Sequence, residues 1–146
     1  MLRDMNKPSE VVSHLRAAIR LDPTTVNAYT YLGDTLNNLK LFDEAVQVYS
    51  KALSFIDPNF GKQPNSRLHP SAMGMAADVH FRTADAYSNM KSAHKAHVHY
   101  QRGAQLDPDN GEVLAGLWFN KLETLEWQAL DESFKSALTV ARKASL

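Results

Sequence analysis

The sequence predicts an all-α fold, a solenoid in which antiparallel helix pairs stack side by side. Two observations lead to this prediction. Apolar and small residues recur at the three- and four-residue spacing of amphipathic helices over most of the chain. Helix-ending aspartate–proline pairs follow these segments at Pro23, Pro58 and Pro108, and Pro23 and Pro58 are 35 residues apart.

Residues 26–58 form the most complete unit of this pattern. Two helices are expected here, with Gly33 and Ala45 allowing the two backbones to approach closely and Phe42 and Tyr49 filling the space around them. Asp57–Pro58 ends the second helix because proline clashes with the preceding turn. The unit is therefore expected to be a complete helix-turn-helix.

This unit resembles the tetratricopeptide repeat. The resemblance rests on a leucine–glycine pair and an aromatic residue in the first helix, and on small residues, an aromatic residue and a terminal proline in the second; these are Leu32, Gly33, Tyr29, Ala45, Ala52, Tyr49 and Pro58. The resemblance implies a short right-handed solenoid. It also implies a peptide-binding or assembly surface whose partner differs from protein to protein.

The rest of the chain is expected to complete a single domain, residues 1–146, around this unit. Residues 9–21 are expected to form one helix closed by Asp22–Pro23, so that residues 9–23 make up the second half of a repeat. Pro58 and Pro108 are 50 residues apart, so the next unit carries an insertion of roughly 16 residues relative to the repeat period. The predicted segments are an inserted loop at 59–71, a repeat at 72–108 and a degenerate capping repeat at 111–146.

The capping repeat is expected to differ from the others. Trp118 takes the place that Gly33 and Ala84 hold in the earlier units, which predicts that the close approach of helices is lost. Two helices are expected, at 112–126 and 128–146. Trp118 and Trp127 are interpreted as core residues, because a terminal repeat must close its own apolar end.

Composition excludes several classes of partner. Lysine plus arginine equals aspartate plus glutamate at 16 each, so nothing in the overall charge indicates nucleic acid or an anionic membrane. The absence of cysteine agrees with a reducing compartment, and no apolar run is long enough for a signal peptide or a membrane span. We therefore expect a cytoplasmic protein.

The motifs of catalysis are missing from the sequence. His94 and His97 are three apart on one helical face, but no third ligand accompanies them, so no metal site is predicted. Gly61–Lys62 lacks the remainder of a phosphate-binding loop, and no Gly-x-Ser-x-Gly sequence occurs. We expect neither an enzyme nor a cofactor.

The resemblance also implies which residues form a binding groove, since first helices line the concave face in that family. The implied peptide-binding residues are Asn27, Thr30, Asp34, Asn37, Asn38, Asp78, Phe81, Asp85, Ser88, Asn89, Glu112 and Phe119, with Ala115, Leu122 and Glu123 beside them. This set is rich in amides and carboxylates and contains no lysine or arginine. It favours an extended peptide that carries lysine, arginine or amide side chains.

An acidic C-terminal tail is not expected as the partner. Chaperone-binding members of the family hold a terminal carboxylate with lysine, asparagine and arginine, whereas Asp34 and Asp85 stand where that clamp needs asparagine. The alternative is that these are ordinary solvated residues of a short spacer.

Two further hypotheses concern the ends of the chain. Trp127, Asp131 and Glu132 resemble the segment after the repeats of O-linked N-acetylglucosamine transferases, so the chain could be the substrate-recruiting part of such an enzyme. At the other end, the half repeat leaves Val11, Leu15 and Ala18 without their own first helix. This predicts cover by Met1, Leu2 and Met5, by upstream repeats of a longer protein, or by a second copy of the chain through weak self-association.

Overall fold

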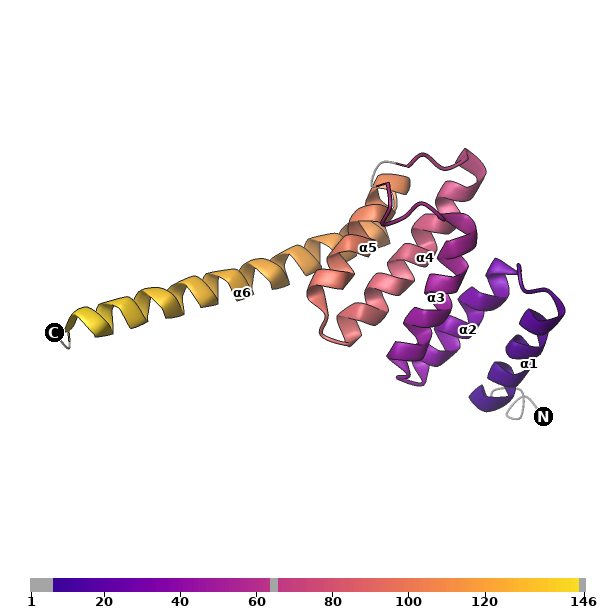
Figure 1. Ribbon diagram of the computed structural model, residues 1–146, viewed down its shortest axis with the longest axis horizontal. Coiled ribbons are helices and arrows are strands. Elements are labelled where there is room, and N and C mark those ends of the chain that lie inside the picture. Colours follow the sequence, from indigo (N-terminus) through magenta and orange to yellow (C-terminus); the bar gives the residue numbers. More distant parts are fainter. Residues whose placement is uncertain (1–6, 64–65, 145–146) are drawn as a thin grey trace.

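A computed structural model describes residues 7–63 and 66–144, apart from the side chains of 126–131, 133, 134 and 138. The described residues form six helices and no strand: α1 (Pro8–Leu21), α2 (Val26–Asn38), α3 (Phe42–Ile56), α4 (Pro70–Asn89), α5 (Ala93–Leu106) and α6 (Gly111–Ala144). Helices α1 to α5 stand side by side in one stack, and the C-terminal half of α6 projects beyond it (Figure 1). The prediction of an all-α helical solenoid is confirmed.

The pairs α2–α3 and α4–α5 are joined by the same kind of turn. Lys40 and Lys91, just after α2 and α4, have φ angles of 62° and 61°. In each turn the next backbone N–H reaches back to a carbonyl of the ending helix, at 2.9 Å from Leu41 to Leu36 and from Ser92 to Tyr87. The two units thus share one turn geometry, although the sequence places lysine where glycine is usual.

The main core lies between α2, α3 and α4 and has Tyr49 at its centre. Tyr49 is 1% exposed, and a Cβ added to Gly33 would lie 2.3 Å from its ring. Only a residue without a side chain allows this contact, as the sequence predicted. The other buried members of this cluster are Tyr29, Leu32, Leu36, Ala45, Val46, Ala52, Leu53, Val79 and Ala86.

Helix α1 uses its apolar face differently from the prediction. Leu15 was assigned with Val11 and Ala18 to the face of the missing helix, but it packs with Val12 and Ile19 against the main core. Ala18 is exposed and Val11 is half-buried. The uncovered face is therefore smaller than predicted; the residues proposed to cover it, Met1, Leu2 and Met5, lie outside the described residues.

Helix α6 contradicts the prediction that the solenoid ends in a capping repeat of two helices. It runs as one helix of 34 residues where two were expected. Trp118 is 63% exposed, so it is not a core residue, and the side chain of Trp127 lies outside the described part. The close approach is also kept, because a Cβ added to Gly116 would lie 2.4 Å from the Tyr100 ring. Gly116, not Trp118, takes the role of the small residue.

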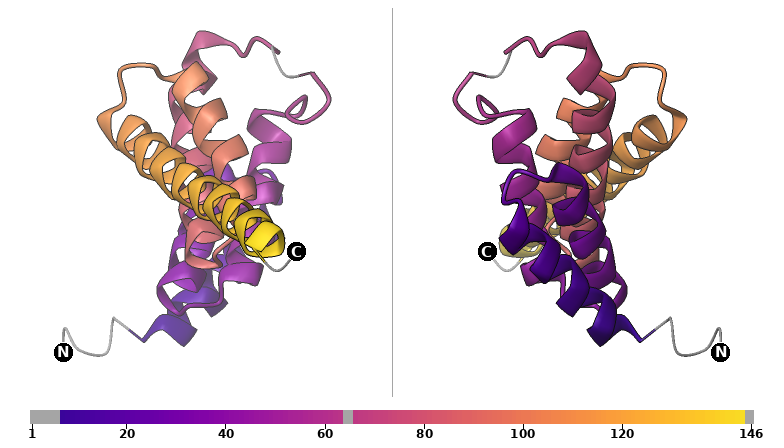
Figure 2. Two further views of the ribbon diagram at one scale, coloured as in Figure 1. Left: turned by 90° about the vertical axis from the view of Figure 1, so that its left-hand side faces the viewer. Right: turned by 90° about the vertical axis from the view of Figure 1, so that its right-hand side faces the viewer.

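The segment between α3 and α4 rises at one edge of the stack (Figure 2). Helix α4 begins at Pro70, two residues earlier than predicted, and the His69 side chain accepts a hydrogen bond from the Ser71 N–H. Within the described residues, none of the helices has the length and apolarity needed to cross a membrane.

Candidate functional site

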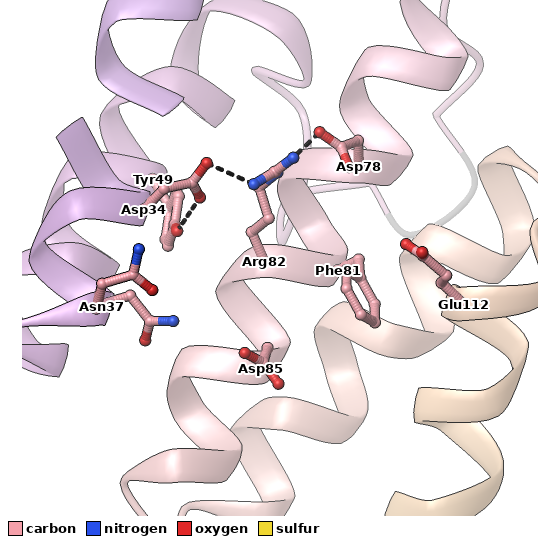
Figure 3. A pocket seen from close by; sticks show the side chains of 9 residues that line it. Asp34, Asn37, Tyr49, Asp78, Phe81, Arg82, Asp85 and Glu112 are labelled. Carbon is pink, nitrogen blue, oxygen red and sulfur yellow. Dashed lines mark hydrogen bonds and ion pairs between the residues drawn. The ribbon is translucent and has the colours of Figure 1, made fainter. Parts of the chain in front are cut away.

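Two adjoining pockets form the candidate site, and they share the side chains of Phe81, Asp85 and Glu112. One, of about 320 Å³, lies between α2 and α4 (Figure 3). The other, of about 510 Å³, lies between α4, α5 and α6. We call the first the α2–α4 pocket, the second the α4–α6 pocket, and the two together the groove.

Most of the residues implied by the repeat resemblance come together in this groove. Those that line it are Asp34, Asn37, Asn38, Asp78, Phe81, Asp85, Ser88, Glu112 and Phe119, with Ala115 and Glu123. Asn27, Thr30 and Asn89 do not line either pocket. Thr30 instead donates its hydroxyl hydrogen to the Val26 carbonyl of its own helix, at 3.0 Å.

Arg82 corrects the prediction that the groove holds no cation. Its side chain lines the α2–α4 pocket, where its guanidinium lies between Asp34 from α2 and Asp78 from its own helix and pairs with both, at 2.9 Å with Asp78 (Figure 3). Both carboxylates raise the pKa of the guanidinium against the opposing effect of its burial. Asp34 and Asp78 therefore share one cation supplied by the protein itself, which neutralises one of their two negative charges.

Asp34 also holds Tyr49. The phenol donates to its Oδ1 at 2.6 Å, and burial together with this carboxylate raises the pKa of Tyr49. The side chain that fills the core of the repeat thus ends in the groove, and Asp34 is engaged by two partners. This position cannot be a freely available acceptor.

Asp85 has a different environment. Burial raises the pKa of its carboxyl, and a hydrogen bond with the Asn37 side chain acts in the opposite direction. Across the described residues, Asn37 Oδ1 is the buried side-chain oxygen or nitrogen that receives no hydrogen bond from the protein. A buried acceptor without a donor costs about 1 to 3 kcal/mol, so the Asn37 side chain is held here at a cost while its amide hydrogen-bonds with Asp85.

The α4–α6 pocket combines aromatic rings with carboxylates. Phe81 and Tyr100 are in ring contact with centroids 6.0 Å apart, and Phe119 is 69% exposed at the pocket wall. Burial raises the pKa of Tyr100 to about 12, with Asp85 and Glu123 adding to the effect. Among the described residues, neither Glu112 nor Glu123 forms an ion pair.

A second polar cluster lies at the base of the inserted segment. Arg102 makes two hydrogen bonds to Asp57, at 2.8 and 3.1 Å, and His80 lies 3.1 Å from the same carboxylate. His80 in turn lies 3.0 Å from His99 through their Nδ1 atoms. His80 and Asp57 are fully buried, and Arg102 is 5% exposed.

This second cluster was missed at the sequence level, although one signal existed. His80 stands where the repeat usually has an aromatic residue, and its ring fills that place. The centroids of the His80 and Phe60 rings are 4.5 Å apart. Arg102 also bonds the backbone oxygen and the hydroxyl of Ser66, at 2.9 and 3.1 Å. The cluster therefore fastens the inserted segment to α4 and α5.

The histidines considered for metal binding do not form a site in the described part. His97 lies 2.9 Å from Asn120 Oδ1, and Asn120 also donates to the Ala93 carbonyl, which ties α6 to the start of α5. Among the residues searched there, no three histidine, cysteine or acidic side chains come together as metal ligands.

Comparisons with known proteins agree with this architecture. Residues 26–59 match the family model described as tetratricopeptide repeat. No curated protein sequence matches the chain. Among solved structures, the first TPR of Spaghetti (RPAP3) bound to the HSP90 peptide SRMEEVD superposes with a TM-score of 0.67 at 16% identity, over 84% of this chain and 83% of that one. MamA MSR-1 C2 superposes with a TM-score of 0.61 at 18% identity, over 97% and 71%.

Proposed function

We propose that this chain is a protein–protein interaction module, not a catalyst, that binds an extended peptide along the groove. The observation that carries the proposal is the groove itself, two adjoining pockets of about 320 and 510 Å³ lined by carboxylate and amide side chains from α2, α4 and α6. These side chains can form hydrogen bonds with an extended peptide, each worth about 0.5 to 1.5 kcal/mol net.

The arrangement of the groove supports an extended ligand. Polar side chains from α2, α4 and α6 follow one another across it, so a peptide lying over them would meet a new set of partners at each helix. The solved TPR of Spaghetti shows that a related fold can hold a peptide. The lack of cysteine supports a cytoplasmic location as part of this proposal.

The charge of the groove decides which peptides are excluded. Five carboxylates and one guanidinium line it, so an acidic ligand would meet a net negative surface. The peptide SRMEEVD should therefore not bind. Isothermal titration calorimetry tests this directly, and tight binding of that peptide would overturn the predicted charge preference.

Selection from a phage-displayed random peptide library tests the proposal itself. Peptides selected on the wild-type chain should lose binding to Asn38→Arg, because an arginine at this exposed position would fill the α2–α4 pocket. Gln47→Arg, an exposed substitution on α3 outside both pockets, is the matched control and should leave binding unchanged. Selected peptides that bind Asn38→Arg as well as wild type would contradict the groove assignment.

The alternative function remains the repeat region of a glycosyltransferase-like enzyme. It rests on Trp127, Asp131 and Glu132, and the side chains of Trp127 and Asp131 lie outside the described residues. The comparisons add no support for it. A sugar-nucleotide domain encoded downstream in the same reading frame would favour this alternative over a free-standing adaptor.

A further inference from the structure

We propose that the α4–α6 pocket is the subsite that takes a lysine or arginine side chain of the bound peptide. This inference rests on the proposed function, narrows the recognised side chain to lysine or arginine, and assigns it to one pocket. It also assigns the two halves of the groove different roles.

The first step is the contrast in charge between the two pockets. In the α2–α4 pocket Arg82 occupies the space between Asp34 and Asp78, so the protein supplies its own cation there. In the α4–α6 pocket Asp85, Glu112 and Glu123 meet no cation from the described residues. Asp85 and Glu112 also line the α2–α4 pocket, where Arg82 is a lining residue, whereas the α4–α6 pocket adds Glu123 and has no lysine or arginine among its lining residues. A ligand cation in the α4–α6 pocket would therefore meet three carboxylates and no competing guanidinium.

The second step is the apolar wall of this pocket. Phe81, Tyr100 and Phe119 line it together with the carboxylates. Lysine and arginine have an apolar stem below the charged group, and the stem can lie along such rings while the charge meets the carboxylates. An ammonium or guanidinium group over an aromatic face gains a further cation–π attraction. An acidic cluster without rings would attract any cation, whereas this combination fits a long basic side chain.

The third step is the position of Asn37 at the other side of Asp85. The Asn37 amide holds the Asp85 carboxylate by a hydrogen bond, while its own oxygen lacks a donor. A peptide that leaves the α4–α6 pocket past Asp85 and Glu112, which both pockets share, would enter the α2–α4 pocket, where Asn37 is a lining residue. Side-chain recognition in one pocket and passage of the backbone through the other are compatible with one extended ligand.

A positional-scanning peptide library tests the inference. Each pool has one position fixed as lysine, arginine, norleucine or glutamate, and binding to the labelled full chain is measured. Norleucine has a straight apolar side chain like the lysine stem but carries no charge. At one position the wild-type chain should prefer lysine or arginine to norleucine by about tenfold, near the lower limit for a hydrogen bond to a charged group.

Charge-removing variants assign this preference to the pocket. Glu112→Gln/Glu123→Gln should reduce the preference for lysine or arginine to about twofold or less, as expected once charge-assisted bonds are lost. Glu10→Gln/Asp43→Asn removes the same charge from exposed positions outside both pockets and should retain it. Thermal unfolding checks that both variants are folded, and the comparison of norleucine with lysine on the wild-type chain stands even if a variant is not.

The outcomes separate the two proposals. Wild-type binding without a preference for lysine or arginine, or a preference kept in Glu112→Gln/Glu123→Gln, would overturn the subsite while leaving the groove as a peptide site. A preference for glutamate would do the same. Absence of binding to every pool would overturn the proposed function together with the subsite.

Discussion

At the scale of single residues, replacing glycine by alanine is expected to change the stability of the fold in opposite directions at two positions, because their surroundings differ. Gly33→Ala should destabilise the fold by about 1 to 3 kcal/mol, the usual cost of overpacking, because the added Cβ would meet the buried Tyr49 ring. Gly74→Ala, in α4 with nothing within 4 Å of the new Cβ, should stabilise it by roughly 0.5 to 1 kcal/mol. Urea unfolding of the two variants measures both effects, and equal changes would refute the packing argument.

The buried histidines predict a loss of stability in weak acid. With both rings neutral, as their burial favours, His80 Nε2–H can donate to Asp57 and His80 Nδ1 can accept from His99 Nδ1–H. Burial lowers the pKa of His80 to about 4 and that of His99 to about 3, from a usual value near 6.5. Because the folded-state pKa values lie below the unfolded ones, stability is full above pH 6.5 and falls as the pH drops towards 4.

Thermal unfolding over this pH range checks the prediction. The wild-type midpoint should fall between pH 6.5 and 4, whereas His14→Gln, which removes an exposed histidine of α1, should show the same decline as wild type. His80→Phe would remove a hydrogen-bond partner of the buried Asp57 carboxylate, so it would change stability at every pH and does not isolate the titration of the ring. A flat wild-type profile over this range would show that these rings are not held neutral in the folded state.

Arg82 illustrates what residue patterns leave out. The repeat resemblance assigned particular helix positions to the groove, and Arg82 was outside this set. A long side chain can reach past its own position on the helix surface, and Asp34 and Asp78 attract it. The acidic character of the groove was predicted from the sequence. Which of its carboxylates lack a cation of the protein, and could therefore pair with a ligand, is known only from the ion pairs of Arg82.

At the scale of elements, the inserted segment gives a prediction about proteolysis. We expect it to open more readily than the helices, since a long irregular segment has few backbone hydrogen bonds to lose. Limited digestion with trypsin should cut first after Lys62 or Arg67. The bonds from Arg102 to Ser66 restrain the chain next to Arg67, which makes Lys62 the earlier site. First cleavage within α2 to α5 would contradict this order.

Helix α6 shows where a sequence signal was available and misread. No glycine or proline follows Gly116, so nothing in the backbone chemistry ends a helix between residues 117 and 144. The expected break came from the repeat period alone. The shift from Trp118 to Gly116 as the small contact residue could not be read in the same way, because it depends on how α6 meets Tyr100.

At the scale of the whole molecule, the face of α1 that no described residue covers predicts weak self-association. Light scattering over a concentration series should show a rising mass. Val11→Glu/Ala18→Glu should abolish the rise, because these residues lie outside the main core while Leu15 packs against it. Glu10→Gln, at an exposed position of the same helix, is a control for general effects. A monomeric wild-type chain at all concentrations would show that this face is not an interface.

The sequence by itself determined the fold class, the units 26–58 and 72–108 that correspond to the helix pairs α2–α3 and α4–α5, and the small residue at Gly33 that lets the helices approach. These features depend on contacts within one helix or between neighbouring helices, whose spacing repeats along the chain. The tertiary structure alone decided that Arg82 neutralises part of the groove, and that Asp57, His80, His99 and Arg102 form one buried cluster. Such pairings join residues from separate helices, and their partners follow from three-dimensional packing and side-chain reach, which no periodicity in the sequence records.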